Sequence, residues 1–197
     1  MSGYRVLIHA CEKRMWYVKE YLVPSLEDQG IKPEIWLDDG KGNLYSCMES
    51  FKNSPKNGGT WHIQDDVVIC KDFSYRTKKA DNGLVCGFNE GSNYRLPLSF
   101  PCIRIPNSYA RECAEWFFAE GREKYKPLAD LGKCDDTFFF YFWKDHKIPF
   151  EVMSPCLVDH IDFLIGGSVC DNRVMIRAAE FDEKIVTELS QKISGSF

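Results

Sequence analysis

Three short apolar runs, separated by two segments of helical spacing, constrain the fold of this 197-residue chain more than any other feature. The runs lie at residues 4–10, 34–38 and 59–73, and they are rich in the β-branched and aromatic residues that favour buried strands. The segments between them, residues 11–29 and 44–52, place apolar side chains three or four positions apart, as amphipathic helices do. This β-α-β-α-β order predicts an α/β fold with a mostly parallel, Rossmann-like layered sheet.

The remaining residues continue the mixed pattern of strands and helices without a domain break. No internal repeat, low-complexity tract or linker interrupts the sequence, and its length suits a single hydrophobic core. The elements expected here are a strand at 83–88, a hairpin or mobile loop at 89–106, helices at 108–125 and 135–146, an extended segment at 150–158, a loop at 162–168 and a closing helix at 178–193. We therefore predict one domain that spans residues 1–197.

Composition and charge favour a soluble globular protein. Hydrophobic residues make up 44% of the chain, and the net charge of −4 gives no general reason to expect binding to nucleic acids or membrane surfaces. The N-terminus lacks the pattern of a signal peptide, and the most apolar later run, residues 137–143, is far too short to span a bilayer. We therefore expect a cytoplasmic protein without a membrane span.

The nine cysteines are scattered, and the sequence contains neither a CxxC motif nor a zinc-type spacing of Cys and His. An odd count without a secretion signal argues against a disulfide framework. Several cysteines lie inside apolar segments, where the thiol behaves as a small hydrophobic group. We expect reduced thiols.

Pairs of adjacent aspartates occur at three positions that a layered sheet would make functional. An Asp-Asp pair is most often a solvated turn, but two of these pairs follow predicted strands and the third opens a predicted helix. Ligands of parallel sheets bind at the carboxyl ends of the strands, so these positions favour a functional role. The pairs are Asp38 and Asp39, Asp65 and Asp66, and Asp135 and Asp136.

The central pair, Asp65 and Asp66, indicates a divalent cation. Both residues follow the apolar residues Trp61 and Ile63, and two anions beside buried strand residues are costly unless a cation shares the site. Mg²⁺ and Mn²⁺ take oxygen ligands and also bind phosphates. The pattern therefore indicates metal-diphosphate chemistry.

The order of these motifs resembles that of the GT-A fold glycosyltransferases, which use nucleotide-diphosphate sugars. Residues 64–66 (QDD) are similar to the DXD-type metal motif of that superfamily, with Gln64 in place of the first acid. Residues 134–136 (CDD) resemble the motif at the head of the catalytic helix, and His160 matches the C-terminal histidine that often completes the metal site. The resemblance spans nearly the whole chain and implies a single GT-A-like α/β/α domain.

The resemblance also implies a donor site. Asp66 and His160 would hold Mn²⁺ or Mg²⁺, because Gln64 cannot act as an anionic ligand. Asp65 would support the metal or contact the ribose. The other residues implied for the nucleotide sugar, with a UDP-sugar as the expected donor, are Arg14 for the diphosphate and Asp38 and Asp39 for the base or ribose.

Catalysis would fall to the acidic pair that opens the predicted helix at 135–146. The resemblance implies that Asp136 is the general base for the acceptor hydroxyl and that Asp135 orients or binds the acceptor. Plainer roles stay open for several of these residues. Asp136 could be a helix N-cap, His160 a core histidine and Arg14 a solvated residue at the start of a helix.

The acceptor is open between a glycan, the general expectation for the superfamily, and a hydroxymethylated base in DNA. A cluster of cations and aromatic residues after the acidic pair could contact a phosphate backbone, and the compact chain also resembles the small glycosyltransferases of DNA-modifying phages. A solvated loop is the plainer interpretation of this cluster. Its residues are Lys71, Phe73, Tyr75, Arg76, Lys78 and Lys79.

Two other functions compete with glycosyl transfer. A nucleotidyltransferase could use the same layered sheet and metal, but residues 9–16 after the first strand contain no glycine for a phosphate loop. A nucleotide-sugar-binding module without catalysis is the other alternative, and Gln64 is the residue that suggests it.

Overall fold

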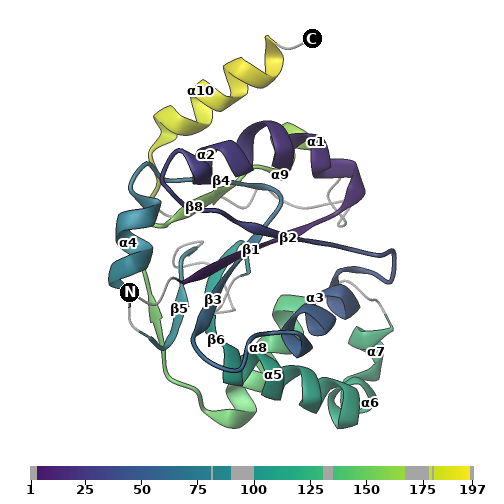
Figure 1. Ribbon diagram of the computed structural model, residues 1–197. Coiled ribbons are helices and arrows are strands. Elements are labelled where there is room, and N and C mark those ends of the chain that lie inside the picture. The colour runs from purple at the N-terminus through teal and green to yellow at the C-terminus, as the bar shows by residue number, and fades with distance from the viewer. Residues whose placement is uncertain are drawn as a thin grey trace.

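A central sheet lies between two layers of helices (Figure 1). The computed structural model describes residues 4–80, 82–89, 100–130, 135–166, 178 and 180–195. The six strands of the sheet are β1 (Arg5–Ala10), β2 (Glu34–Leu37), β3 (Gly59–Gln64), β5 (Leu84–Cys86), β6 (Cys102–Pro106) and β7 (Phe150–Val152), in the order β2-β1-β3-β6-β5-β7. All run in one direction except β6, which is antiparallel to both of its neighbours. This order confirms the predicted α/β fold with a mostly parallel, layered sheet.

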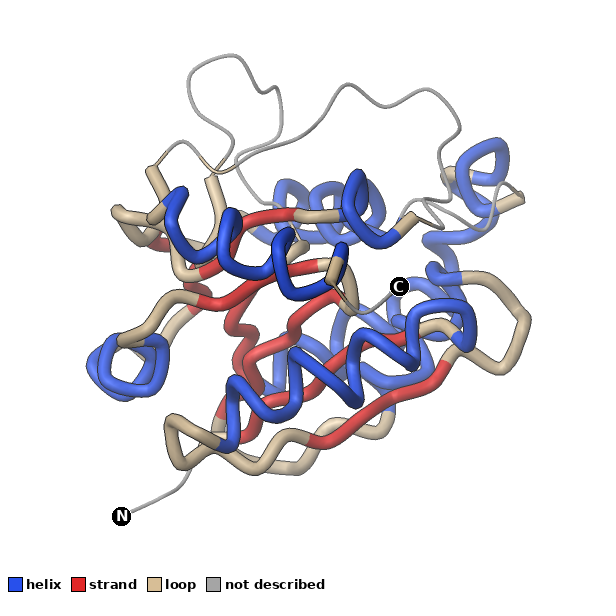
Figure 2. The backbone as a smooth tube through the Cα atoms, turned by 90° about the horizontal axis from the view of Figure 1, so that it is seen from above, coloured by secondary structure: helices blue, strands red, loops and turns tan. Residues whose placement is uncertain are grey.

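One helical layer covers the upper face of the sheet in Figure 1, and the other covers the lower face. The predicted helix at 11–29 is a run of short helical segments: η1 (Glu12–Arg14), α1 (Met15–Tyr17), the π-helical η2 (Val18–Leu22) and α2 (Val23–Glu27). Also in the upper layer are α9 (Asp162–Ile165) and α10 (Glu183–Ser194). The lower layer holds α3 (Asn43–Lys52), α5 (Asn107–Trp116), η3 (Phe117–Gly121), α6 (Arg122–Lys124), α7 (Lys126–Ala129) and α8 (Asp135–His146). Figure 2 shows from above how helices lie across the strands.

Strand alternation divides the hydrophobic core into two clusters, one on each face of the sheet. Val6 and Ile8 of β1 pack with the α1–α2 side, whereas Ile103 and Ile105 of β6 pack with α3, α5 and α8. Successive side chains of a strand point to opposite faces, and β5 accordingly supplies Val85 to one cluster and Leu84 and Cys86 to the other.

Two elements differ from the sequence prediction in the strands. Residues 89–106 are predicted as a hairpin or mobile loop, and residues 90–99 of this range lie outside the described residues. Cys102–Pro106 is not loop but the buried strand β6, which is antiparallel to β5, as in a hairpin, and also to β3. The run at 59–73 does not stay in one sheet either. It leaves the central sheet after Gln64, and β4 (Val67–Ile69) pairs with β8 (Val158–His160) in a separate antiparallel sheet.

Two short helices also differ from the prediction. Phe73–Lys79 forms α4, where a basic loop was one interpretation of the sequence. Asp162–Ile165 forms the single turn α9, where a loop was predicted, and Asp162 in its first turn suits the helix dipole. No helix among the described residues is long and apolar enough to cross a membrane.

A histidine pair lies between the sheet and α3. Nε2 of His9, on β1, is 2.8 Å from Nδ1 of His62, on β3, and the ring of Phe51 packs edge-on against His62. The sequence assigns no partner to either histidine, because the two rings meet only when β1 and β3 pair side by side.

Candidate functional site

The turn between β3 and β4 places two carboxylates at the carboxyl end of a central strand. β3 ends at Gln64 and β4 begins at Val67, so Asp65 and Asp66 form the turn, and both are nearly inaccessible to solvent. The backbone N–H of Ile161 donates to the Asp66 carbonyl at 2.8 Å, and Val67 is the register partner of His160. The small β4–β8 sheet therefore brings His160 beside Asp66.

Arg14 lies between the two carboxylates. Its Nη1 is 2.9 Å from Asp65 Oδ1 and 2.5 Å from Asp66 Oδ2, while its Nε donates to the carbonyl of Gly166 at 3.0 Å. The backbone N–H of Cys11 donates to the other oxygen of Asp65 at 2.7 Å. The segment that follows β1 thus holds both carboxylates, and Arg14, with an exposure of 6%, is not the solvated residue that the sequence allowed.

His160 connects Asp66 to a further carboxylate. Its Nε2 is 3.1 Å from Asp66 Oδ2, and its Nδ1 is 3.5 Å from Asp162 Oδ1. The sequence analysis missed Asp162, although an acid two positions after the histidine was the available signal. We call Arg14, Asp65, Asp66, His160 and Asp162 the ionic cluster.

Burial and charge shift the pKa values of the two turn carboxylates in opposite directions. Burial acts to raise the pKa of Asp66, but the hydrogen bond and charge of His160 and the charge of Arg14 hold it below its ordinary value. Burial and the neighbouring Asp66 raise the pKa of Asp65. Burial acts to lower the pKa of Arg14, but the two carboxylates outweigh it and raise that pKa. Of the two carboxylates, Asp66 is therefore the one that stays ionised to lower pH.

Asp66 and His160 contact each other directly, and both side chains are of types that bind divalent ions. Asp66 Oδ2 is 3.1 Å from His160 Nε2, the distance of a hydrogen bond. Oδ1 of Asp66 is buried without a hydrogen-bond partner in the described part of the chain, and a cation would satisfy it. Among the described residues, no group of three or more His, Cys, Asp or Glu side chains is arranged to hold a metal. An ion here would take its other ligands from phosphate and water.

The structure does not bring the acidic pair Asp38 and Asp39 into the ionic cluster. The N–H of Lys41 donates to Asp39 Oδ1 at 3.3 Å, and Lys41 Nζ lies 2.6 Å from Asp39 Oδ2 on an exposed surface. Asp38 accepts the N–H of Gly40 at 3.0 Å. The backbone N–H of Asp38 donates to Ala10 at 2.8 Å, so the pair does lie beside the end of β1.

The third acidic pair lies on the other side of the sheet, at the start of α8. Oδ1 of Asp136 accepts the backbone N–H of Thr137 at 2.7 Å and lies 3.3 Å from the Thr137 hydroxyl. Asp136 stands inside the first turn of α8, which begins at Asp135, and not at the N-cap position. No described side chain of the ionic cluster contacts it, and the side chain of Asp135 lies outside the described residues.

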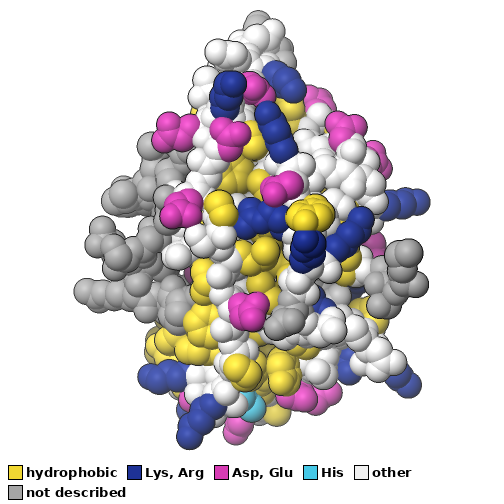
Figure 3. All heavy atoms as spheres, turned by 90° about the vertical axis from the view of Figure 1, so that its left-hand side faces the viewer, with side chains coloured by type: hydrophobic (Ala, Val, Ile, Leu, Met, Phe, Trp, Pro, Cys, Tyr) yellow, Lys and Arg dark blue, Asp and Glu magenta, His cyan; other side chains and the backbone are white. Residues whose placement is uncertain are grey.

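The basic cluster after the acidic turn is only partly available for binding. Arg76 donates to the carbonyl of Cys156 at 3.2 Å and to that of Pro155, so its guanidinium fastens α4 to the chain before β8. Lys79 lies over the ring of Tyr75, with 4.1 Å from Nζ to the ring centroid. Figure 3 shows basic side chains interspersed with hydrophobic ones on the face that carries α4. The exposed lysines that remain are Lys71, Lys78 and Lys79.

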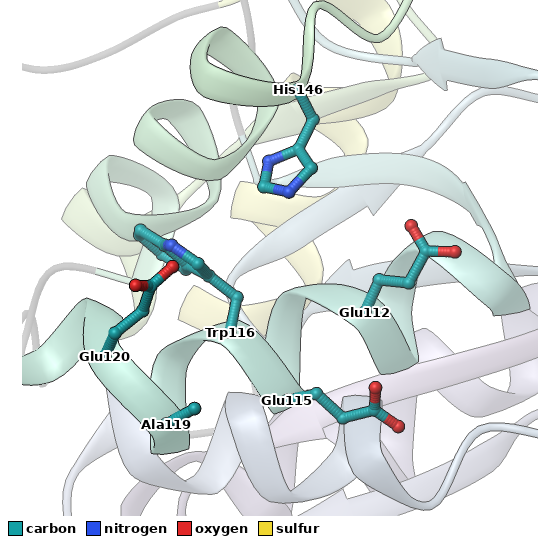
Figure 4. A pocket seen from close by; sticks show the side chains of 6 residues that line it. All are labelled: Glu112, Glu115, Trp116, Ala119, Glu120 and His146. Atoms are coloured by element: carbon teal, nitrogen blue, oxygen red, sulfur yellow. The ribbon is translucent and has the colours of Figure 1, made fainter.

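Two cavities lie away from the ionic cluster. One, of about 580 Å³, is an open groove between α5 and the end of α8, lined by Glu112, Glu115, Trp116, Ala119, Glu120 and His146 (Figure 4). The other, of about 470 Å³, lies between α4, the segment before β8 and the start of α10. Neither contains a residue that the sequence analysis selected for the donor or the metal.

Comparisons with known proteins identify the fold. No protein-family model matches the sequence, and no curated protein matches it. Among solved structures, the chain is similar to a glycosyltransferase involved in the glycosylation of the major capsid of PBCV-1, at 10% identity and a TM-score of 0.48 over 77% of this chain and 82% of that one.

A second likeness is to a mutant of Drosophila β1,4-galactosyltransferase 7, whose structure is a complex with manganese, UDP-Gal and xylobiose. The identity is 8% and the TM-score 0.53, and the match covers 96% of this chain and 80% of that one. The match extends over nearly the whole chain. This chain therefore has the fold of a GT-A-type glycosyltransferase.

Proposed function

We propose that this protein is a metal-dependent glycosyltransferase, which moves a sugar from a nucleotide-diphosphate donor to a hydroxyl acceptor. The observation that carries the proposal is the position of Asp66 and His160, 3.1 Å apart at the carboxyl end of a central strand of this fold. Ligands of such sheets bind at this edge.

Asp66 and His160 would hold Mn²⁺ or Mg²⁺, and an imidazole ligand favours Mn²⁺ over the harder Mg²⁺. The bound ion would supply a Lewis acid for the negative charge that develops on the leaving phosphate. Asp65 would hold Arg14 and the N–H of Cys11, the contacts that fix the turn. Asp38 and Asp39, beside the end of β1, would accept hydrogen bonds from the ribose or base.

Asp136 would take the proton from the acceptor hydroxyl, with Asp135 as its neighbour in the first turn of α8. Asp136 lies on the face of the sheet that α8 covers, opposite α1 and α2. The acceptor would therefore have to approach the sugar from the α8 side of the sheet.

A UDP-sugar donor and a glycan acceptor are the partners that we propose. The Drosophila neighbour was crystallised with manganese, UDP-Gal and xylobiose, which supports this choice. A hydroxymethylated base in DNA is the weaker candidate, because Arg76 is committed to backbone carbonyls and the exposed lysines of the basic cluster flank a chain of net charge −4.

The first test is calorimetric titration with a panel of nucleoside diphosphates, with and without Mn²⁺. We expect one nucleotide to bind in a Mn²⁺-dependent way, and Asp66→Ala to weaken that binding by at least about tenfold. Asp130→Ala, on the surface after α7, is the matched control and should bind as the wild type does. Absence of binding to every nucleotide in the panel contradicts the proposed function.

Asp162 should matter for the metal through His160. The Asp162 carboxylate approaches Nδ1 of His160 to 3.5 Å without a hydrogen bond, and closing this distance when the ion binds would fix the ring and its tautomer. Loss of such a carboxylate typically costs about tenfold or more in metal affinity. We therefore expect Asp162→Ala to weaken Mn²⁺ binding about tenfold in the presence of the nucleotide, measured from the electron paramagnetic resonance signal of free Mn²⁺. An unchanged affinity would mean that Asp162 does not orient His160.

A further inference from the structure

We infer that Arg14 is a resident counter-cation of Asp66, which a divalent ion displaces with the help of a diphosphate. The inference rests on the proposed function, since it concerns the metal proposed at Asp66 and His160. It adds a role for Arg14 that the resemblance alone does not give: in the free protein, this side chain blocks the metal.

The first step of the argument is the fixed position of Arg14. The guanidinium contacts three acceptors from two parts of the chain, namely both turn carboxylates and the carbonyl of Gly166. Arg14, Asp65 and Asp66 are each no more than 6% exposed. An ion pair at this burial is not screened by solvent, so it persists until another cation replaces it.

The second step is competition for one oxygen. Asp66 Oδ2 is already 2.5 Å from Arg14 Nη1 and 3.1 Å from His160 Nε2. A divalent ion held by Asp66 and His160 would share the Asp66 carboxylate with the positive guanidinium, whether it used Oδ2 or the unpartnered Oδ1. Two positive charges in contact with the same carboxylate repel each other strongly in a buried site. Arg14 and the ion therefore cannot both stay beside Asp66 at low cost.

The third step is the destination of Arg14. The planar guanidinium fork matches phosphate oxygens, and a diphosphate offers several of them. A diphosphate would therefore take Arg14 away from Asp66 and at the same time supply ligands to the ion. Since coupling between two ligands is reciprocal, the ion and the diphosphate should each raise the affinity of the other.

The test measures Mn²⁺ affinity, from the resonance signal of free Mn²⁺, in the wild type, in Arg14→Met and in the control Arg122→Met on the exposed surface of α6. Without nucleotide, we expect Arg14→Met to bind Mn²⁺ about tenfold more tightly than the wild type and the control. With UDP as the probe, the wild type should gain at least about tenfold in Mn²⁺ affinity, and Arg14→Met much less.

Equal or weaker binding of Mn²⁺ by a folded Arg14→Met overturns the inference, even if the wild type binds Mn²⁺ and UDP and the proposed function stands. Conversely, tighter Mn²⁺ binding by Arg14→Met without any nucleotide binding would support the blocking role of Arg14 but overturn the step that involves the diphosphate.

Removing Arg14 leaves two buried carboxylates uncompensated and can unfold the protein. The pair Asp65→Asn and Arg14→Met/Asp65→Asn avoids this charge excess, and the double variant should bind Mn²⁺ more tightly than Asp65→Asn alone. Equal binding by these two variants also overturns the inference.

Discussion

Replacement of Asp136 by Asn is expected to lower the rate of sugar transfer by about 10²- to 10⁴-fold, the usual contribution of a general base. The amide has nearly the same shape as the carboxylate, so the contacts to Thr137 can persist while the ability to accept a proton is lost. Asp136 is not in contact with the described side chains of the ionic cluster, so nucleotide binding should stay within about twofold of the wild type. Transfer is measured as release of the nucleoside diphosphate, and binding by calorimetry.

Asp145→Asn is the matched control for this prediction. Asp145 stands near the other end of α8, where its carboxylate lies 2.8 Å from Lys124, so its loss leaves the start of the helix unchanged. We expect transfer by this variant at the wild-type rate. Nucleotide binding by the wild type without any transfer would favour the binding module. Release of pyrophosphate instead of a nucleoside diphosphate would identify a nucleotidyltransferase.

The strands and helices that the sequence predicted correctly are those whose signal is local. β1, β2 and β3 are short apolar runs, and α3 and α8 show helical spacing over ten and twelve residues. β6 was missed because residues 102–106 stand among prolines and polar residues, and its strand conformation depends on pairing with two distant strands. The same reason explains why β4 and β8 were not recognised as a separate sheet.

The ionic cluster shows the same division between local and distant signals. Motif order selected Arg14, Asp65, Asp66 and His160, and the structure brings these four together, although their roles in donor and metal binding stay predictions. The sequence analysis paired Arg14 with the diphosphate of the donor, whereas the fold pairs it with the two turn carboxylates. This contact joins residues about fifty positions apart, so no local pattern predicts it. Two carboxylates that are buried next to each other need a cation of the protein's own whenever no ligand is bound.

The histidine pair gives the second large effect, a loss of stability in mild acid. Burial, followed by the charge of Arg5, lowers the pKa of His9 to about 4. Burial, with the neighbouring charges of His9 and Arg5, also holds the pKa of His62 well below its ordinary value. In the unfolded chain both histidines titrate near 6.5. Between these values the unfolded state binds more protons, so stability is complete above about pH 6.5 and is lost as the pH falls toward 4.

The free energy of unfolding, measured by urea denaturation, should therefore fall by about 2 to 4 kcal/mol between pH 7.5 and 4.5. The double variant His9→Leu/His62→Leu should lose most of this dependence, because it removes both rings and leaves no buried polar partner behind. His146→Asn, at the exposed end of α8, should retain it. Nε2 of His62 has no hydrogen-bond partner among the described residues, so a proton bound there would bring a charge that nothing nearby stabilises. A wild-type profile that stays flat over this pH range would contradict the argument, because the pair would then accept a proton without any loss of stability.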